Sequence, residues 1–184
     1  FVTGGTGSAL ADTATQNGGI AIGGHSTASA IQTIALGGAT ASAQSAIALG
    51  WSSVASGEEA VALGVYSTAA SQGVAVGANV TATGYGAVAI GGDDVTPIWG
   101  AHIGGIAVVP SVDSSTHASG NASVAYGSGA LASTDGATAI GTMATASGSM
   151  GTALGLYARA TSDYGVALGG ASVTDGASTT GTEP

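Results

Sequence analysis

The amino-acid sequence predicts an all-β fold, a parallel β-roll (β-solenoid) in which short rungs stack along one axis. A four-residue unit, apolar-Ala-apolar-Gly, recurs in two blocks, and its successive glycines are thirteen or fourteen positions apart. A fixed short period of this kind is the sequence signature of a repeat architecture. The 34 glycines among 184 residues disfavour helices, and the apolar positions alternate with a period of two, as in strands. We therefore expect each rung to hold two short strands separated by glycine-rich or polar turns.

The first strand of each rung is predicted in the apolar-Ala-apolar part of the unit. Strands of neighbouring rungs are expected to pair about 4.8 Å apart. Ten units share one register, six before a break and four after it. They are Ile20-Ala21-Ile22-Gly23, Ile34-Ala35-Leu36-Gly37, Ile47-Ala48-Leu49-Gly50, Val61-Ala62-Leu63-Gly64, Val74-Ala75-Val76-Gly77, Val88-Ala89-Ile90-Gly91, Val124-Ala125-Tyr126-Gly127, Thr138-Ala139-Ile140-Gly141, Thr152-Ala153-Leu154-Gly155 and Val166-Ala167-Leu168-Gly169.

The second strand is predicted in a unit with Ala between two hydroxyl residues, as in Thr81-Ala82-Thr83. Because side chains alternate between the two faces of a strand, Ala82 is expected to point inward and Thr81 and Thr83 outward. We take Thr81 and Thr83 as candidate ligand-facing residues. Related units are Thr40-Ala41-Ser42, Val54-Ala55-Ser56, His117-Ala118-Ser119 and Thr145-Ala146-Ser147.

The same alternation assigns faces to the first strand. The two larger residues, such as Ile47 and Leu49, are expected to fill the interior, which places Ala48 on the outer side. The first-strand alanines then form an apolar stripe outside the roll, which we interpret either as a surface for packing against other subunits or as a face that tolerates small residues. The stripe consists of Ala21, Ala35, Ala48, Ala62, Ala75, Ala89, Ala125, Ala139, Ala153 and Ala167.

The rhythm of the repeat divides the chain into five segments. Residues 1–19 are predicted to be a lead-in with a degenerate first rung, and residues 20–91 to be regular rungs. Residues 92–123 are predicted to hold a degenerate rung and an insertion loop, and residues 124–170 to be regular again. Residues 171–184 are expected to be a degenerate terminal rung at the end of a piece of a longer protein.

The degenerate rung is predicted at Ala101-His102-Ile103-Gly104, because its glycine follows Gly91 at the spacing of the regular units. The extra loop is then placed within about residues 105–115. Just after it, Tyr126 takes the place of an aliphatic residue that this scheme points inward.

Three residues of this irregular stretch, Asp93, Asp94 and Trp99, are candidate ligand-facing residues. Insertions in solenoids emerge on one face and often carry binding. A doublet of aspartates is more typical of a solvated turn than of a binding site. Trp99, like Trp51, is too large for a thin interior, so it is expected outside, as a ligand anchor or in packing between subunits.

Charge composition excludes several classes of partner. Ten acidic residues face one basic residue, Arg159, and the net charge is −9. Without lysine there is no basic patch to neutralise phosphates, so no nucleic-acid partner is expected. The mean hydropathy is +0.45, yet no apolar run approaches the roughly 18 residues of a spanning helix, so the head itself is not expected to insert into a membrane.

Catalytic and metal-binding patterns are missing from the sequence. There is no Gly-x-Ser-x-Gly or His-Glu-x-x-His motif, and no cysteine to act as a nucleophile or thiolate ligand. His25, His102 and His117 fall in different rungs without ligand spacing, and Glu58-Glu59 is interpreted as a solvated turn doublet. We therefore expect no enzymatic activity, no metal and no cofactor.

The repeat units resemble the YadA-like head repeat of trimeric autotransporter adhesins. The resemblance is carried by Ser-Ala-Ile-Ala-Leu-Gly at residues 45–50, Ala-Val-Ala-Leu-Gly at residues 60–64 and Thr-Ala-Thr-Gly-Tyr-Gly-Ala-Val-Ala-Ile-Gly at residues 81–91, and it covers about residues 20–170. It implies a left-handed parallel β-roll that forms a homotrimeric head. It also implies display on the bacterial cell surface, with anchoring in the outer membrane through segments outside this chain.

Two functions of different class follow. The resemblance implies an adhesin head that attaches by multivalent display to host extracellular matrix or to cell-surface proteins or glycans, with a passive structural spacer as its alternative. The hydroxyl residues of the second strand suggest instead an ice- or crystal-binding ladder. Val54, Ala70, Leu131 and Arg159 interrupt that ladder.

Overall fold

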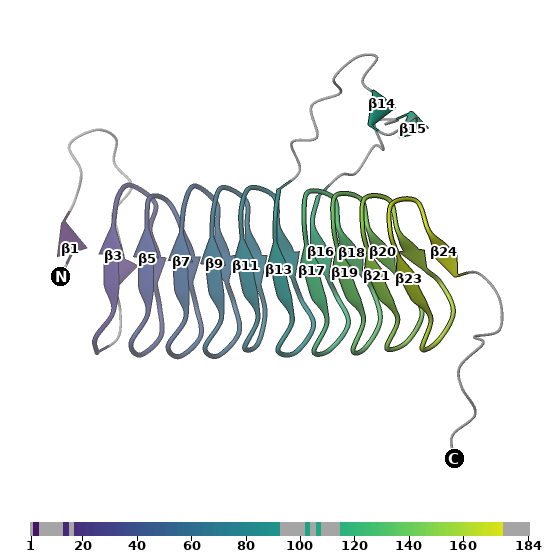
Figure 1. Cartoon of the computed structure of the whole chain (residues 1–184). Helices are drawn as coiled ribbons and strands as arrows, with labels where there is room; N and C mark the ends of the chain where they lie inside the picture. The colour runs from purple at the N-terminus through teal and green to yellow at the C-terminus, as the bar shows by residue number, and fades with distance from the viewer. Residues whose placement is uncertain are drawn as a thin grey trace.

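The structure, a computed structural model, describes residues 2–3, 13–14, 17–92, 102–103, 106–107 and 115–174. The chain winds through two parallel sheets of 11 strands each. Figure 1 shows the rungs stacked in a row from β3 (Ile20–Ile22) to β23 (Val166–Leu168). The predicted fold class, an all-β parallel solenoid, is confirmed, and the described residues contain no helix.

The first sheet holds one three-residue strand from each of the ten repeated units, together with the two-residue strand β1, and each strand pairs with the next strand of the sheet. In chain order it contains β1 (Val2–Thr3), β3 (Ile20–Ile22), β5 (Ile34–Leu36), β7 (Ile47–Leu49), β9 (Val61–Leu63), β11 (Val74–Val76), β13 (Val88–Ile90), β17 (Val124–Tyr126), β19 (Thr138–Ile140), β21 (Thr152–Leu154) and β23 (Val166–Leu168).

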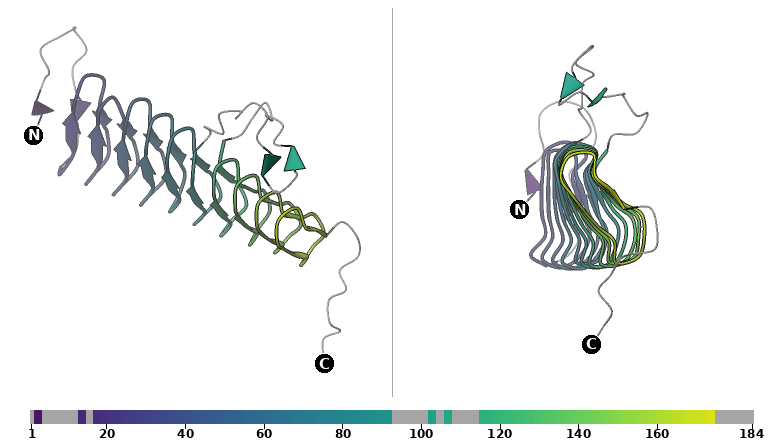
Figure 2. Two further views of the ribbon diagram at one scale, coloured as in Figure 1. Left: turned by 45° about the horizontal axis from the view of Figure 1, so that its top comes forward. Right: turned by 45° about the vertical axis from the view of Figure 1, so that its right-hand side comes forward.

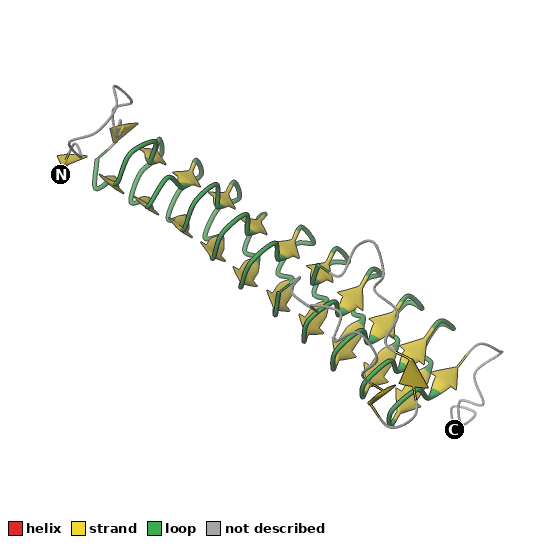
Figure 3. Cartoon of the chain, turned by 90° about the horizontal axis from the view of Figure 1, so that it is seen from above, coloured by secondary structure: helices red, strands yellow, loops and turns green. Residues whose placement is uncertain are grey.

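The second sheet holds the two-residue strands, and it runs beside the first sheet as a second row (Figure 3). It contains β2 (Thr13–Ala14), β4 (Thr27–Ala28), β6 (Thr40–Ala41), β8 (Val54–Ala55), β10 (Thr68–Ala69), β12 (Thr81–Ala82), β16 (His117–Ala118), β18 (Leu131–Ala132), β20 (Thr145–Ala146), β22 (Arg159–Ala160) and β24 (Val173–Thr174). The rungs superpose closely along the stack, which gives the solenoid a flattened outline (Figure 2).

The core consists almost entirely of alanine. Alanines of the first sheet stack in register, as Ala62, Ala75 and Ala89 do, and the inward alanines of the second sheet stack in the same way, as Ala69 and Ala82 do. The residue before each strand of the two sheets, from β3 onward, also points inward, because it lies two positions from the inward residue of that strand. It is glycine, alanine, serine or threonine, except for the buried Val80 before β12. Ala46 and Ala60 before first-sheet strands, and Ser53 and Ser67 before second-sheet strands, are all fully buried. Each rung thus offers its interior about four side chains of very small volume.

This arrangement corrects the face assignment of the first strand. The prediction that the larger residues fill the interior and the alanines form an outer stripe is wrong. Nine of the ten stripe alanines have no exposed surface within the single chain, and Ala167 is 3% exposed. Conversely, Leu49 is 36% exposed and Tyr126 is 55% exposed, so Tyr126 does not point inward either. For the second strand the prediction is confirmed, since Ala82 is fully buried.

The physical reason is the short perimeter of a rung. Each rung closes within one period of the repeat, and its two strands are only three and two residues long. The two sheets are therefore so close that the fully buried side chains are mostly alanine and none is larger than valine. Packed interiors leave no free volume, and side chains that exceed the space force backbone shifts. For the first strand, the prediction that side chains alternate between two faces is therefore correct, but the two faces are assigned the wrong way round. The side chains predicted to point inward point outward, and those predicted to point outward point inward.

The glycine that ends most units is required by the same close stacking. Gly50 has a φ of +115°, and a Cβ placed there would lie 2.8 Å from the carbonyl carbon of Gly64 in the next rung. Gly127 repeats this geometry against Gly141, at 2.7 Å. A side chain at these positions would combine backbone strain with a collision against backbone atoms.

The insertion is larger than predicted, and the degenerate rung is not a rung. β14 (His102–Ile103) and β15 (Ile106–Ala107) form an antiparallel pair that joins neither large sheet. Instead β13 pairs directly with β17, and β12 with β16. The two large sheets thus continue directly across this part of the sequence, and Figure 1 shows β14 and β15 apart from the stacked rungs. Residues 93–114, which separate the two parts of the solenoid in the sequence, are here called the excursion.

Thr116 closes the base of the excursion. Its buried hydroxyl has one proton to donate, to the carbonyl of Gly127 (2.8 Å) or that of Gly92 (3.1 Å), and it accepts from the backbone N–H of Gly92 (3.1 Å). These bonds connect the rung before the excursion with the one after it. The two parts of the solenoid, before Gly92 and after Thr116, are therefore bonded to each other without any contribution from residues 93–114.

Deletion of residues 93–114 is expected to leave the solenoid intact. It restores the regular spacing of the repeat between Gly91 and Gly127, and it leaves a turn of regular length from Gly92 through Ser115 to Thr116. Circular dichroism should show the same β spectrum and a melting temperature within a few degrees of the parent chain. Removal of residues 93–107 alone, which leaves a partial excursion, is the comparison. Unfolding of the full deletion would mean that the excursion is part of the fold.

Candidate functional site

The outward residues of the first sheet form a continuous apolar surface, here called the aliphatic face. It consists of two columns, one on each side of the buried alanines. The first column is Ile20, Ile34, Ile47, Val61, Val74, Val88, Val124, Thr138, Thr152 and Val166, and the second is Ile22, Leu36, Leu49, Leu63, Val76, Ile90, Tyr126, Ile140, Leu154 and Leu168. Adjacent members of a column are register partners, so the side chains stack without a break.

The aliphatic face is unusually apolar for the surface of a single chain. All of its residues are half-buried or exposed, and its exposed fractions include 43% at Ile22 and 45% at Leu154. Monomeric proteins rarely keep contiguous apolar patches larger than a few hundred Å², and larger patches mark interaction sites. A flat, rigid ladder of branched side chains about 4.8 Å apart is shaped to pack against another flat surface.

The outward side of the second sheet carries hydroxyl groups. Thr81 is half-buried and Thr83 is exposed, so both candidate ligand-facing threonines lie on this side, as expected. The column through Thr81 is not uniform, however. Thr68 and His117 are its register partners, followed by Leu131. A regular hydroxyl lattice is therefore absent from this part of the described sheet.

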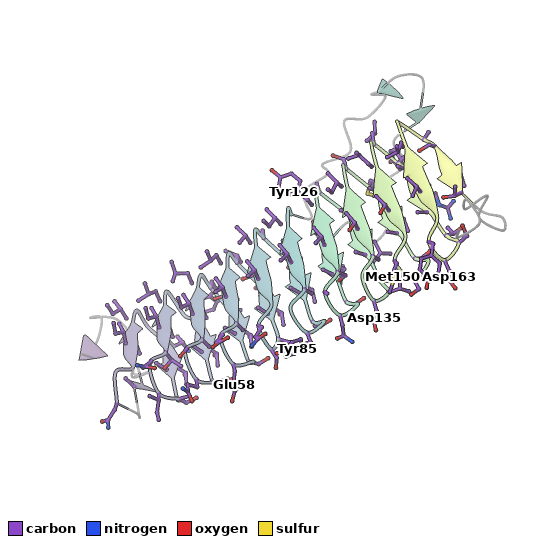
Figure 4. All side chains as sticks on the ribbon, turned by 60° about the horizontal axis from the view of Figure 1, so that its bottom comes forward. Glu58, Tyr85, Tyr126, Asp135, Met150 and Asp163 are labelled. Atoms are coloured by element: carbon purple, nitrogen blue, oxygen red, sulfur yellow. The ribbon has the colours of Figure 1, made fainter. Side chains whose placement is uncertain are left out.

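Within the described ranges, the acidic residues Glu58, Glu59, Asp135 and Asp163 lie on the turns that lead into the first sheet. Figure 4 shows Glu58, Tyr85, Asp135, Met150 and Asp163 along this edge, with Tyr126 at the first sheet. The carboxylates hold one rung to the next. The backbone N–H of Asn121 donates to Asp135 Oδ1 (2.8 Å), and that of Ser149 donates to Asp163 Oδ1 (2.9 Å). Glu58 and Glu59 are exposed, and Glu59 Oε2 accepts from Gln72 Nε2 at 3.2 Å. These acids act as rung-to-rung connections.

Three further candidates, Asp93, Asp94 and Trp99, lie outside the described residues. Trp51 is 50% exposed on the turn between β7 and β8. No group of His, Asp or Glu side chains within the described ranges is arranged to hold a metal ion. A search of the same residues for a helix long and apolar enough to cross a bilayer found none.

A family model described as YadA head domain repeat (2 copies) matches residues 14–40, 41–67, 118–144, 132–158 and 146–172. The chain belongs to the YadA head family. The matched ranges cover regular rungs on both sides of the excursion, where the alanine core and the aliphatic face are continuous. YadA heads belong to the trimeric autotransporter adhesins, a structural and surface-exposed class. The resemblance inferred from the repeat units is thus confirmed. A search of the curated proteins found no match.

The residues of the aliphatic face escaped the sequence prediction because that prediction assigns them to the interior. One signal in this YadA head sequence indicates the correct phase. The residue that precedes each first-sheet strand shares the inward side with the central alanine, and it is always small. It is Gly19, Thr33, Ala46, Ala60, Gly73, Ala87, Ser123, Ala137, Gly151 or Gly165. A column that never holds a large residue is typical of the more confined side of a strand.

Proposed function

We propose that this chain is the head of a bacterial surface adhesin, and that three copies pack through their aliphatic faces into a homotrimer. The observation that supports the trimer is the continuity of the aliphatic face from β3 to β23. Association would remove this surface from water, which is favourable by roughly 25 cal/mol per Å² of apolar area. In this proposal the buried alanine columns take no part in the interface, and the two columns of the aliphatic face on either side of them make the subunit contact.

The proposed role is attachment to host extracellular matrix or to cell-surface molecules. A trimer presents each weak binding surface three times on a rigid rod, and many rods share one cell, so avidity exceeds the affinity of a single contact. Anchoring in the outer membrane would come from segments outside this chain. The second-sheet side with Thr81 and Thr83 lies outside the proposed interface and is a proposed ligand-facing surface. Asp93, Asp94 and Trp99 of the excursion are proposed as further ligand-facing residues.

Adhesion can be tested with beads that carry the trimeric head at defined density. We expect retention on matrix-coated or cell-coated surfaces under flow, with retention rising more steeply than in proportion to head density, because several heads engage at once. Beads carrying an unrelated acidic protein of the same net charge are the control. Retention no greater than this control would instead indicate a spacer that only holds other segments away from the cell.

A further inference from the structure

The turns between the first and second sheets carry three exposed aromatic residues, His25, Trp51 and Tyr66, along one edge of the rungs, here called the aromatic edge. Trp51 is 50% exposed and Tyr66 is 53% exposed. The two lie on adjacent rungs, and the backbone N–H of Tyr66 donates to the carbonyl of Trp51 at 3.0 Å. The edge lies on the opposite side of the rungs from the acidic turns that lead into the first sheet.

A short turn in the preceding rung creates the seat for Trp51. The turn from β5 to β6 holds only two glycines before Ala39, whereas the turns on either side hold three residues before the inward residue. Gly37 and Gly38 both have positive φ, +72° and +81°. A Cβ added to Gly38 would lie 2.7 Å from Cε3 of Trp51, so the indole rests directly on the glycine backbone.

The orientation of the indole is held from several sides. His25, two rungs back, packs edge-on against it with ring centroids 5.6 Å apart and an interplanar angle of 74°. The supporting backbone is itself tied down, because Gly38 N–H donates to the buried Ser26 Oγ at 3.0 Å. The indole ring therefore presents an open surface in a fixed position. Because folding already orders this side chain, binding a ligand need not lose the conformational entropy of the side chain again.

We propose that the aromatic edge binds a neutral sugar residue of a host glycan, an inference that rests on the proposed adhesive function. Sugar rings have apolar C–H faces that stack on aromatic rings, and hydroxyl groups at their rim that bind polar neighbours. Trp51 and Tyr66 supply the rings, and the exposed Ser52 between them supplies a hydroxyl. Stacking on an open aromatic platform requires no deep pocket, as the binding of single-stranded nucleic acids to such platforms shows.

The negative charge of the chain favours uncharged glycans over anionic ones as ligands. The net charge is −9, and its single basic residue, Arg159, lies on β22, many rungs from Trp51. An anionic sugar would meet no lysine or arginine at the aromatic edge, and it would be repelled by the overall charge. Sialylated, sulfated and uronic-acid sugars are therefore excluded as preferred ligands. A protein partner is disfavoured, because Val65 (43% exposed) is the one exposed aliphatic residue beside the rings on these turns, and the other exposed turn residues there are glycine and serine, which offer little apolar area to an anchoring side chain.

The test measures binding of the head to immobilised neutral oligosaccharides and to their sialylated and sulfated counterparts. We expect binding to neutral sugars, and a loss of about tenfold or more in Trp51→Ala and Tyr66→Ala. Gly38→Ala should also weaken binding, because it displaces the indole without removing it. Tyr85→Ala is the matched control, since Tyr85 is 59% exposed on the opposite turns, and its binding should stay within twofold.

Several outcomes would overturn the proposal. The aromatic edge would be a subunit contact if Trp51→Ala lowered the mass of the assembly in light scattering. It would be a protein-binding surface if Trp51→Ala abolished adhesion to matrix that had been enzymatically deglycosylated. Adhesion that is unchanged in Trp51→Ala would defeat this inference and leave the adhesin function standing. A parent head that neither adheres to any surface nor binds any sugar would defeat both.

Discussion

Replacement of Ala75 by leucine is expected to unfold the centre of the solenoid. Ala75 is fully buried and stacks between Ala62 and Ala89, in an interior whose other side chains are no larger than valine. Overpacking an ordinary core costs about 1–3 kcal/mol. Here the extra atoms have no neighbouring void to enter, so the sheets must separate over several rungs. We expect the melting temperature to fall by more than about 10 °C, or no folded protein at all, as followed by circular dichroism.

The matched control is Val76→Leu, one residue away on the same strand. Val76 points outward and is half-buried on the aliphatic face, so the larger side chain has room and the isolated chain should lose little stability. An Ala75→Leu variant as stable as the parent would contradict the alanine core. That result would instead support the assignment in which the larger residues of the first strand point inward.

Two aspartates on the aliphatic face are expected to convert the trimer into monomers. In Leu63→Asp/Val74→Asp, each copy would bring two charges into the proposed interface, six in all, and burying unpaired carboxylates is strongly unfavourable. Light scattering should give about 16.9 kDa in place of three times that mass. The circular dichroism spectrum of the parent should persist, because both side chains lie outside the alanine core.

A charge-matched control separates the face from the added charge. Thr40→Asp/Thr68→Asp carries the same two aspartates on the outward side of the second sheet, at half-buried positions of β6 and β10. This variant should keep the mass of the parent. A parent chain that is already monomeric, or a trimer that survives both pairs of aspartates, would show that the aliphatic face is not the subunit interface.

Much of the fold could be predicted because period and alternation are local properties of the sequence. The ten repeated units are the ten three-residue strands of the structure, and Ala82 points inward as expected. The phase of the first strand could not be obtained in the same way. Alternation distinguishes two faces without saying which is inside, and the assumption that the larger face is buried fails when the enclosed space accepts only methyl groups.

The extent of the excursion could not be predicted for a related reason. Ala101-His102-Ile103-Gly104 matches the repeat locally, but a match of four small or apolar residues says nothing about pairing. Only the β13–β17 and β12–β16 pairs show where the solenoid resumes. The aromatic edge was not predictable either, since the seat of Trp51 depends on a missing residue one rung away. Its only sequence trace is that Gly50 follows Gly37 at the shorter of the two spacings found in the repeat.

A core made mostly of alanine has few rotamers to fix. Alanine loses no side-chain conformational entropy on folding, so adding a rung to the stack orders mainly backbone, and little search for compatible side-chain packing is needed. Every rung also presents nearly the same small surface to the rungs before and after it. Rungs are therefore interchangeable building units, and the gain or loss of a whole rung would lengthen or shorten the rod without any compensating substitution in its interior.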